Sequence, residues 1–344
     1  MRRGLISWSK EEMPEAVLKG RFQELQKSMV ENNLDACLAY TSIAQPSAVN
    51  WLTHFTPYWS EALLVVLPEG SPILLASLTK RVHTWINEVS LMGEIRMAPK
   101  LGENTTALLN EKLQKKAKVG VIGMNSLPGS VSSFLFNETN GIQFVDFSET
   151  FSKIKLRSDL SEVGLVKRAE KIAKIAFDKL TNLYHSASTL ASELELHARL
   201  EGAEEVIIRI APDLSKNSVF CRLETELSLA STFSVELSLA YKGVWIRSVK
   251  NFAGENAFNE YKSAEKWWSE AVRDFKFSND SMPKSSKVEH HVHSSFEACL
   301  GVYPLEALDF KHINKDQKIS WGVLSAEIQF GQFIWPASQA VYCS

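Results

Sequence analysis

The sequence predicts an α/β domain followed by an α+β domain. Helix and strand patterns alternate over residues 1–155, whereas residues 156–344 carry two helices, then strands, a further helix and more strands. A chain of 344 residues suits two domains, and an apolar fraction of 45% is enough for two cores. We therefore expect one domain over residues 1–155 and a second over residues 156–344.

In the first half, apolar residues recur at helical spacing from Glu15 until Asn32-Asn33, which end the predicted helix. Two apolar runs flank the turn Pro68-Glu69-Gly70-Ser71-Pro72, so a hairpin is expected over residues 62–78. The other predicted elements are strands at 34–40, 118–123 and 142–146 and a helix at 128–137.

The second half opens with a helix signal. Asp159 precedes Glu162 by three residues, a capping-box arrangement, and an apolar stripe then continues to about Tyr184. The segment 278–287 is rich in Ser and Lys and is expected to be an exposed loop. The other predicted elements are helices at 189–201 and 261–275 and strands at 206–210, 233–239, 244–249, 320–330 and 333–342.

Charge and composition exclude several classes of partner. A net charge of −2 gives no field that would attract nucleic acid or an anionic membrane. No apolar run reaches the roughly 20 residues of a membrane span, and no export signal is visible, which predicts a cytoplasmic protein. The four cysteines have no paired spacing, which indicates reduced thiols instead of disulfides or a zinc site.

Four stretches resemble one superfamily in order and spacing. They are Leu34–Tyr40 with Val49–Phe55, Leu156–Glu162, Phe233–Gly243 and Trp321–Glu327. With them the chain resembles the creatinase, aminopeptidase P and methionine aminopeptidase superfamily, in its two-domain form. The resemblance implies a creatinase-type N-terminal domain over 1–155 and a catalytic-type domain of pita-bread fold over 156–344.

The resemblance also implies where metal ligands would lie. Metal-dependent members hold two divalent ions with two aspartates on a hairpin, a histidine and two glutamates. The aspartate positions here carry Glu236 and Arg247, and no carboxylate is present around Ala337-Ser338-Gln339, where the last glutamate would fall. Because arginine stays protonated and cannot bind a cation, we expect no metal ion and no other cofactor.

Creatinase itself is a metal-free member, and likeness to it implies roles for the remaining groups. His293 would carry a proton, Glu236 and Glu327 would hold the cationic part of a substrate, and Arg247 would hold its anionic part. Glu327 lies in an apolar strand, where a carboxylate facing the core would need a partner.

Three alternatives stay open for these residues. Glu236 and Arg247 equally fit a structural salt bridge. His290, His291 and His293 fit an exposed polar loop, and which of them faces the pocket is undecided. No histidine stands near residues 218–222, where the general base of creatinase would fall, so Arg222 is the polar candidate there.

Aromatic residues complete the list of candidate substrate contacts. By analogy with the creatinase dimer, Phe55, Tyr58 and Trp59 of a partner subunit would form an aromatic wall, unless they pack in a core or an interface. Trp245 and Tyr303 are candidates of the same kind.

Together these expectations describe a metal-independent, homodimeric hydrolase that cleaves a C–N bond of a small polar nitrogen compound. The alternative is a catalytically silent pita-bread module that binds a peptide or metabolite. A peptidase of the Xaa-Pro aminopeptidase type with a divergent metal set ranks third.

Overall fold

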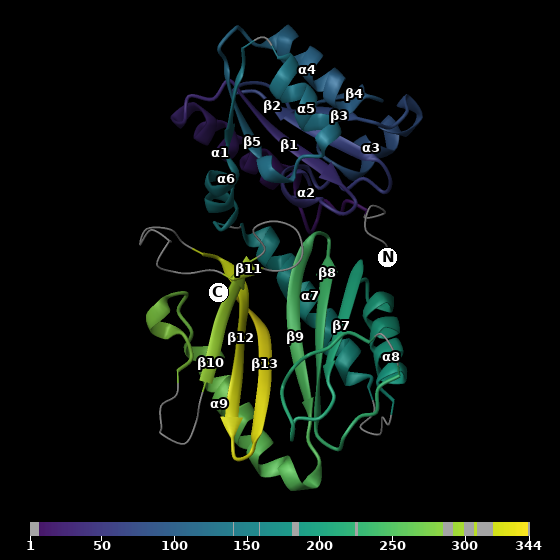
Figure 1. The fold of residues 1–344 in the computed structure, drawn as a ribbon, viewed down its shortest axis with the longest axis vertical. Helices are drawn as coiled ribbons and strands as arrows, with labels where there is room; N and C mark the ends of the chain where they lie inside the picture. Colours follow the sequence, from purple (N-terminus) through teal and green to yellow (C-terminus); the bar gives the residue numbers. More distant parts are fainter. Residues whose placement is uncertain are drawn as a thin grey trace. The chain divides into compact units, whose positions relative to one another are not determined.

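The computed structural model describes residues 7–139, 141–157, 159–180, 186–223, 226–284, 292–298, 306–307 and 319–342. These residues form two compact units that divide between Ser161 and Glu162, and each is described by itself below (Figure 1). We call them the N-terminal and the C-terminal unit. Among the described residues, no helix combines the length and the apolar character that crossing a membrane requires.

The N-terminal unit is built on one six-stranded sheet, in the order β4-β3-β2-β1-β5-β6. In its centre, β1 pairs antiparallel with β2 and parallel with β5. The strands are β1 Ala36–Ser42, β2 Glu61–Val66, β3 Ile73–Ala76, β4 Glu94–Met97, β5 Lys118–Ile122 and β6 Gln143–Asp146. The helices are α1 Glu15–Glu31, α2 Ser47–Thr53, α3 His83–Val89, α4 Leu101–Lys112, α5 Gly129–Glu138 and α6 Ser148–Lys155.

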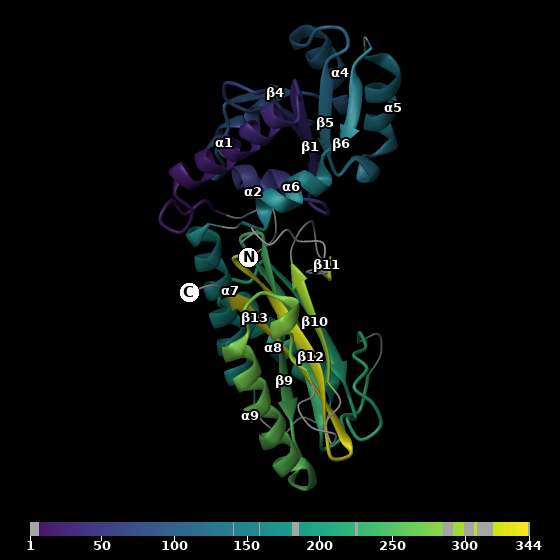
Figure 2. The same ribbon diagram turned by 90° about the vertical axis from the view of Figure 1, so that its left-hand side faces the viewer.

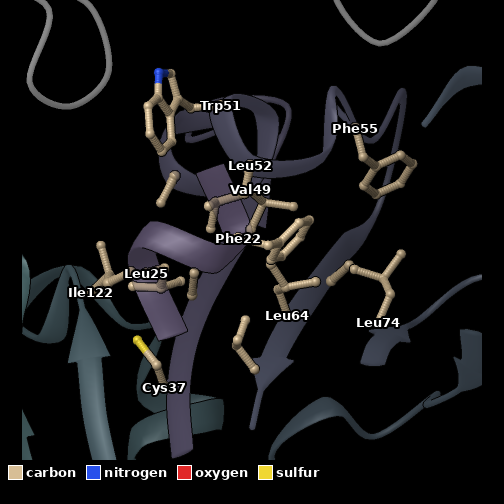
Figure 3. Packing of buried hydrophobic residues seen from close by; sticks show 14 of the residues in the cluster. Phe22, Leu25, Cys37, Val49, Trp51, Leu52, Phe55, Leu64, Leu74 and Ile122 are labelled. Atoms are coloured by element: carbon tan, nitrogen blue, oxygen red, sulfur yellow. The ribbon is translucent and has the colours of Figure 1, made fainter. Parts of the chain in front are cut away.

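Both faces of this sheet are buried, because successive strand residues point to opposite sides. On one face, Leu64 packs with Phe22 and Leu25 of α1 and with Leu52 of α2 (Figure 3). On the other face, alternate residues of β1 and β2 pack with α4 and α5. The unit is thus a three-layer α/β domain, as predicted.

The candidate aromatic wall lies in this unit, and one of its members is not available to a ligand. Phe55 is completely buried in the core beside α2, where its ring packs edge-on against Trp85 (Figure 3). Its predicted role as a substrate contact is therefore wrong, and the packing alternative holds. Tyr58 is half-buried, and Trp59 is exposed and stacks on Trp85.

The C-terminal unit contains two sheets, in the orders β7-β8-β9 and β11-β10-β12-β13, and β9 lies beside β13. Helices α7 and α9 lie on one side of the strands (Figure 2). The strands are β7 Glu205–Ala211, β8 Phe233–Tyr241, β9 Val244–Phe252, β10 Val292–Ala298, β11 Glu306–Ala307, β12 Trp321–Phe330 and β13 Phe333–Tyr342. The helices are α7 Leu160–Asp178, which begins just before the unit, α8 Ala187–Leu200 and α9 Phe258–Asp274.

The predicted fold class is confirmed in both units. The hairpin expected at 62–78 is the antiparallel pair of β2 and β3, and the pair expected at the end of the chain is that of β12 and β13. Five elements of the N-terminal unit, α2, α3, α4, α6 and β4, and strands β10 and β11 of the C-terminal unit were not predicted.

Candidate functional site

The predicted site residues of the C-terminal unit gather on the sheet face that turns away from the helices. Lys250 of β9 points toward α7, where its Nζ donates to the carbonyl oxygen of Phe177 at 2.9 Å. Arg247 stands three positions earlier on the same strand and therefore points to the opposite side. We call the side of Arg247 the inner face and the side of Lys250 the outer face.

Four charged side chains form a row across the inner face, one from each of four strands. Arg209 of β7 lies opposite Glu236 of β8, and it donates from Nε and Nη2 to the two carboxylate oxygens, both at 2.7 Å. Nε of Arg247 lies 3.7 Å from Oε2 of Glu236, and Nη1 of Arg247 donates to Oε2 of Glu297 on β10. We call Arg209, Glu236, Arg247 and Glu297 the charge chain.

The charge chain is buried at its centre and electrically balanced. Glu236 is 3% exposed and Arg247 is 9% exposed, so both charges depend on their partners in place of water. Two arginines and two glutamates alternate along the row, which gives no net charge. Burial raises the pKa of the Glu297 carboxyl, and the positive charge of Arg247 opposes this shift.

These residues do not fit a pair of divalent ions. The carboxylates of Glu236 and Glu297 already accept hydrogen bonds from guanidinium groups, and Arg247 stands between them. An ion placed there would meet a permanent positive charge. Within the described ranges, no group of three or more His, Cys, Asp or Glu side chains is arranged to hold a metal ion.

His293 and Glu327 occupy the same inner face, outside the charge chain. They lie directly opposite each other on the paired strands β10 and β12, and both are exposed. Glu327 does not face the core, because its strand turns that side chain to the exposed side, and the partner expected for it is the hydroxyl of Ser218. The loop interpretation of His293 is wrong, because His293 is the second residue of a strand.

Ser218, for which the sequence predicted no role, contacts Glu327. It lies near the stretch where the general base of creatinase was expected, is 7% exposed, and donates from Oγ to Oε1 of Glu327 at 3.0 Å. A serine hydroxyl is a hydrogen-bond partner and does not titrate near neutral pH. Ser218 thus orients Glu327 without supplying the missing base.

The remaining candidates are dispersed. Trp245 is buried on the inner side of β9, and Arg222 is exposed. Ser338, on the strand where the last metal-binding glutamate was sought, shares a 2.8 Å hydrogen bond with Ser325. Tyr303, His290 and His291 lie outside the described residues.

Sequence reasoning missed Arg209, Glu297 and Ser218. One signal was present for Arg209, because a single arginine interrupts the apolar strand Glu205–Ala211. A charge in such a run requires a buried partner or a solvated side. No comparable signal marks Glu297, because its strand was not predicted.

Comparison with known proteins places this geometry in context. Residues 21–156 match the model of the Creatinase/Prolidase N-terminal domain. A search among proteins of curated function finds no significant match.

Several solved structures share the fold of nearly the whole chain. A prolidase from Thermococcus sibiricus is 15% identical with a TM-score of 0.70, and the alignment covers 95% of this chain and 94% of that one. The Xaa-Pro dipeptidase from Bacillus anthracis is 15% identical with a TM-score of 0.71, covering 95% of each chain. An X-Pro aminopeptidase from Thermotoga maritima is 13% identical with a TM-score of 0.69, covering 93% of this chain and 94% of that one.

At these identities the likeness establishes the fold and leaves activity open. Residues 21–156 are similar to the Creatinase/Prolidase N-terminal domain, and the chain has the two-domain pita-bread fold of these prolidase and Xaa-Pro dipeptidase structures.

Proposed function

We propose that this protein is a metal-independent pita-bread module that binds a peptide or a peptide-like metabolite on its inner face without cleaving it. The charge chain is the observation that carries the proposal. Glu236, at a position where metal-dependent members carry an aspartate, is bound to Arg209, and Arg247, at the other such position, is bound to Glu297. Their charges are used within the protein and are not available for catalysis.

The ligand in this proposal meets the part of the inner face that the charge chain leaves free. Glu327 and His293 are exposed there, side by side in register, and Ser218 fixes one carboxylate oxygen of Glu327. An exposed carboxylate suits the amino group of a short peptide. The peptide class comes from the similar folds, whose names include prolidase and Xaa-Pro dipeptidase.

The test combines metal analysis with ligand binding. Purified protein is equilibrated with Mn²⁺, Co²⁺ or Zn²⁺, dialysed and analysed for metal, and alanyl-proline binding is measured by calorimetry. We expect metal far below one ion per chain, and dipeptide that binds and is recovered intact by mass spectrometry. Glu327→Gln should weaken binding about tenfold, the usual scale for one charge-assisted hydrogen bond, while Glu270→Gln on α9 leaves it unchanged. Near-stoichiometric metal together with cleavage of the dipeptide would contradict the proposal.

A second candidate is a metal-independent hydrolase that acts on a C–N bond of a small polar nitrogen compound. The observation that favours it is that His293 and Glu327 lie directly opposite each other on paired strands, since an imidazole beside a carboxylate is a common arrangement for proton transfer. Guanidino, betaine and cyclic amidine compounds are the substrates to screen. Turnover that is lost in His293→Ala would support it, and its absence across the panel counts against it.

A homodimer is compatible with both candidate functions. In it, Tyr58 and Trp59 of one subunit would contribute to the site of the other. Light scattering of the purified protein gives the oligomeric state, and Trp59→Ala should then weaken ligand binding in the dimer. A monomer at micromolar concentration would remove this part of the proposal.

A further inference from the structure

The outer face of the C-terminal unit carries a groove that none of the functions above uses. It lies between α7, α9 and the outer sides of β9 and β13, and its volume is about 690 Å³. Sites for small molecules usually have volumes of this order. The residues that matter for its chemistry are Phe177, Lys250, Tyr261, Trp268 and Trp335. We call it the outer groove.

Two hydrogen-bond donors of the outer groove are incompletely satisfied. Trp335 is 0% exposed, and its indole Nε1 has no hydrogen-bond partner among the described residues. Lys250 is half-buried, and the one hydrogen bond seen for its ammonium group within the described part of the chain goes to the carbonyl oxygen of Phe177. A buried donor without an acceptor is costly, so the indole N–H of Trp335 favours a ligand that brings an oxygen acceptor. The ammonium group of Lys250 has three N–H groups, of which the bond to Phe177 uses one.

The carboxylates around the outer groove, in contrast, have partners. Asp178 lies 3.5 Å from the ammonium of Lys174, Glu265 accepts a hydrogen bond from the hydroxyl of Tyr261 at 3.0 Å, and Glu170 accepts one from Tyr342. No carboxylate lies within ion-pair distance of Lys250 in the described ranges. The lining carries three lysines and three carboxylates and so has no net charge, but Lys250 is held by a carbonyl oxygen and feels Asp178 only from beyond ion-pair distance. Its ammonium group is therefore the cation of the groove that is most open to a further acceptor.

Aromatic rings form the rest of the wall. The rings of Tyr261 and Trp335 lie 5.5 Å apart between centroids, and Trp268, one turn away from Ala264 on α9, is half-buried at the groove. Flat apolar surfaces of this kind hold a planar or aliphatic body by burying its surface from water. The groove thus combines an apolar wall with two hydrogen-bond donors, the ammonium group of Lys250 and the indole N–H of Trp335.

We propose that the outer groove binds a small amphipathic carboxylate, with the carboxylate on Lys250 and the indole N–H of Trp335 and the apolar body between Tyr261 and Trp268. This site lies on the opposite face from the charge chain. It therefore does not depend on the function proposed for the inner face.

The test uses a matched pair of probes, 1-naphthaleneacetate and its neutral amide, 1-naphthaleneacetamide. Binding to the full chain is measured by calorimetry and by tryptophan fluorescence. We expect the carboxylate to bind at least tenfold more tightly than the amide, because only the carboxylate gains the charge-assisted contact with Lys250. Lys250→Met keeps the length of the side chain and should remove that preference. Lys266→Met, at an exposed position of helix α9 outside the groove, should not remove it.

A second variant separates the role of the indole nitrogen from that of the ring. Trp335→Phe removes the Nε1 donor and keeps an aromatic side chain, so carboxylate binding should fall about fivefold while circular dichroism stays unchanged. Equal binding of acid and amide overturns the proposal. So does unchanged affinity of the acid in folded Lys250→Met, or no binding of either probe to the unmodified chain at millimolar concentration.

Discussion

Strand β9 carries one positively charged side chain on each face, and the two have different partners. On the inner face, Arg247 stands between two carboxylates and is almost completely shielded from water. On the outer face, three residues further along, Lys250 is held by a backbone carbonyl and is not paired with a carboxylate in the described part of the chain. The inner charge is used by the protein itself, whereas the outer charge is left for another molecule.

This difference shows that the number of charged groups is a poor guide to a ligand site. The inner face has four charges in a row, yet each lies beside an opposite charge in that row. The outer groove has fewer buried polar groups, but two of them have hydrogen-bonding capacity left. Nε of Arg247 also lacks a hydrogen bond, but carboxylates on both sides compensate its charge. An unmet hydrogen bond therefore indicates a site only where a groove gives a ligand room beside it.

The largest expected effect comes from breaking the charge chain at its centre. Arg247→Met leaves Glu297 without its guanidinium partner and removes one of the two arginines beside Glu236. Removal of one partner from a buried pair typically costs about 3–5 kcal/mol, and we expect a loss in free energy of unfolding of about 3 kcal/mol. Chemical denaturation measures it. Arg273→Met, at an exposed arginine paired with Asp274, should leave stability nearly unchanged, because solvent screens such a pair.

A double variant sharpens the same comparison. In Arg247→Met/Glu297→Met both members of the Arg247–Glu297 pair become apolar, so neither leaves an unpaired buried charge. Replacement of a whole buried pair by apolar residues is often close to neutral, and most of the lost stability should return. If the double variant is no more stable than Arg247→Met alone, the cost does not come from the unpaired carboxylate.

The next prediction compares the loss of stability when a side chain is enlarged in a tightly packed part of the outer face and in the outer groove. A methyl group at Gly322 of β12 would lie 2.1 Å from Cζ of Phe296 and 2.8 Å from the carbonyl oxygen of Glu297. Gly322→Ala should therefore cost about 2 kcal/mol through overpacking. Ser248→Val adds more volume, but it does so in the outer groove, and it should cost less than about 0.5 kcal/mol. Equal losses in the two variants would mean that the groove is closed in solution.

A smaller effect on the free energy of unfolding, of about 1 kcal/mol, is expected from the titration of Glu170 at the edge of the outer groove. Burial raises the pKa of Glu170 from its ordinary value of 4.5 to about 7, while Tyr342 and Lys167 act in the opposite direction. Between these two pKa values the folded protein binds more protons at this group than the unfolded chain does. Glu170 therefore lowers the free energy of unfolding as pH rises from 4.5 to 7, and the cost persists above pH 7.

Glu170→Gln removes this titration and should stabilise the protein at pH 8 but not at pH 4.5. The gain at pH 8 should be about 1 kcal/mol, less than the full pKa shift implies, because the side chain is only half-buried. Denaturant titrations at both pH values measure it. Glu265→Gln, at an exposed carboxylate on the same groove, is the control for removal of a carboxylate.

Long periodic elements of the fold were predictable from the sequence, and short ones were not. Helix α1 and the hairpin of β2 and β3 have clear apolar patterns and strong turn signals. Helix α4 was missed because Gly102, Asn104 and two threonines lower its intrinsic helix propensity. The structure gives a reason for the glycine, because a Cβ at Gly102 would lie 2.5 Å from the carbonyl oxygen of Ser130 on α5.

The candidate site was predictable only in part, for a similar reason. Glu236 and Arg247 stood out because they replace residues that a metal site requires. Their partners Arg209 and Glu297 are 27 and 50 residues away from them in the chain, and they meet only through strand register and the approach of the two sheets. Single-sequence patterns do not fix such pairings across strands.

The smallest expected effect on stability is at the exposed end of the inner face. Ser218→Ala removes the hydrogen bond to Glu327, but water is able to replace it because that carboxylate is exposed, so the free energy of unfolding should fall by less than about 1 kcal/mol. Binding of alanyl-proline should nevertheless weaken by several-fold, since Glu327 loses the group that orients it. Ser218→Thr keeps the hydroxyl and is the matched control. A loss of stability as large as that of Arg247→Met would instead make Glu327 part of the buried charge network, and the distinction between the two parts of the inner face would then be wrong.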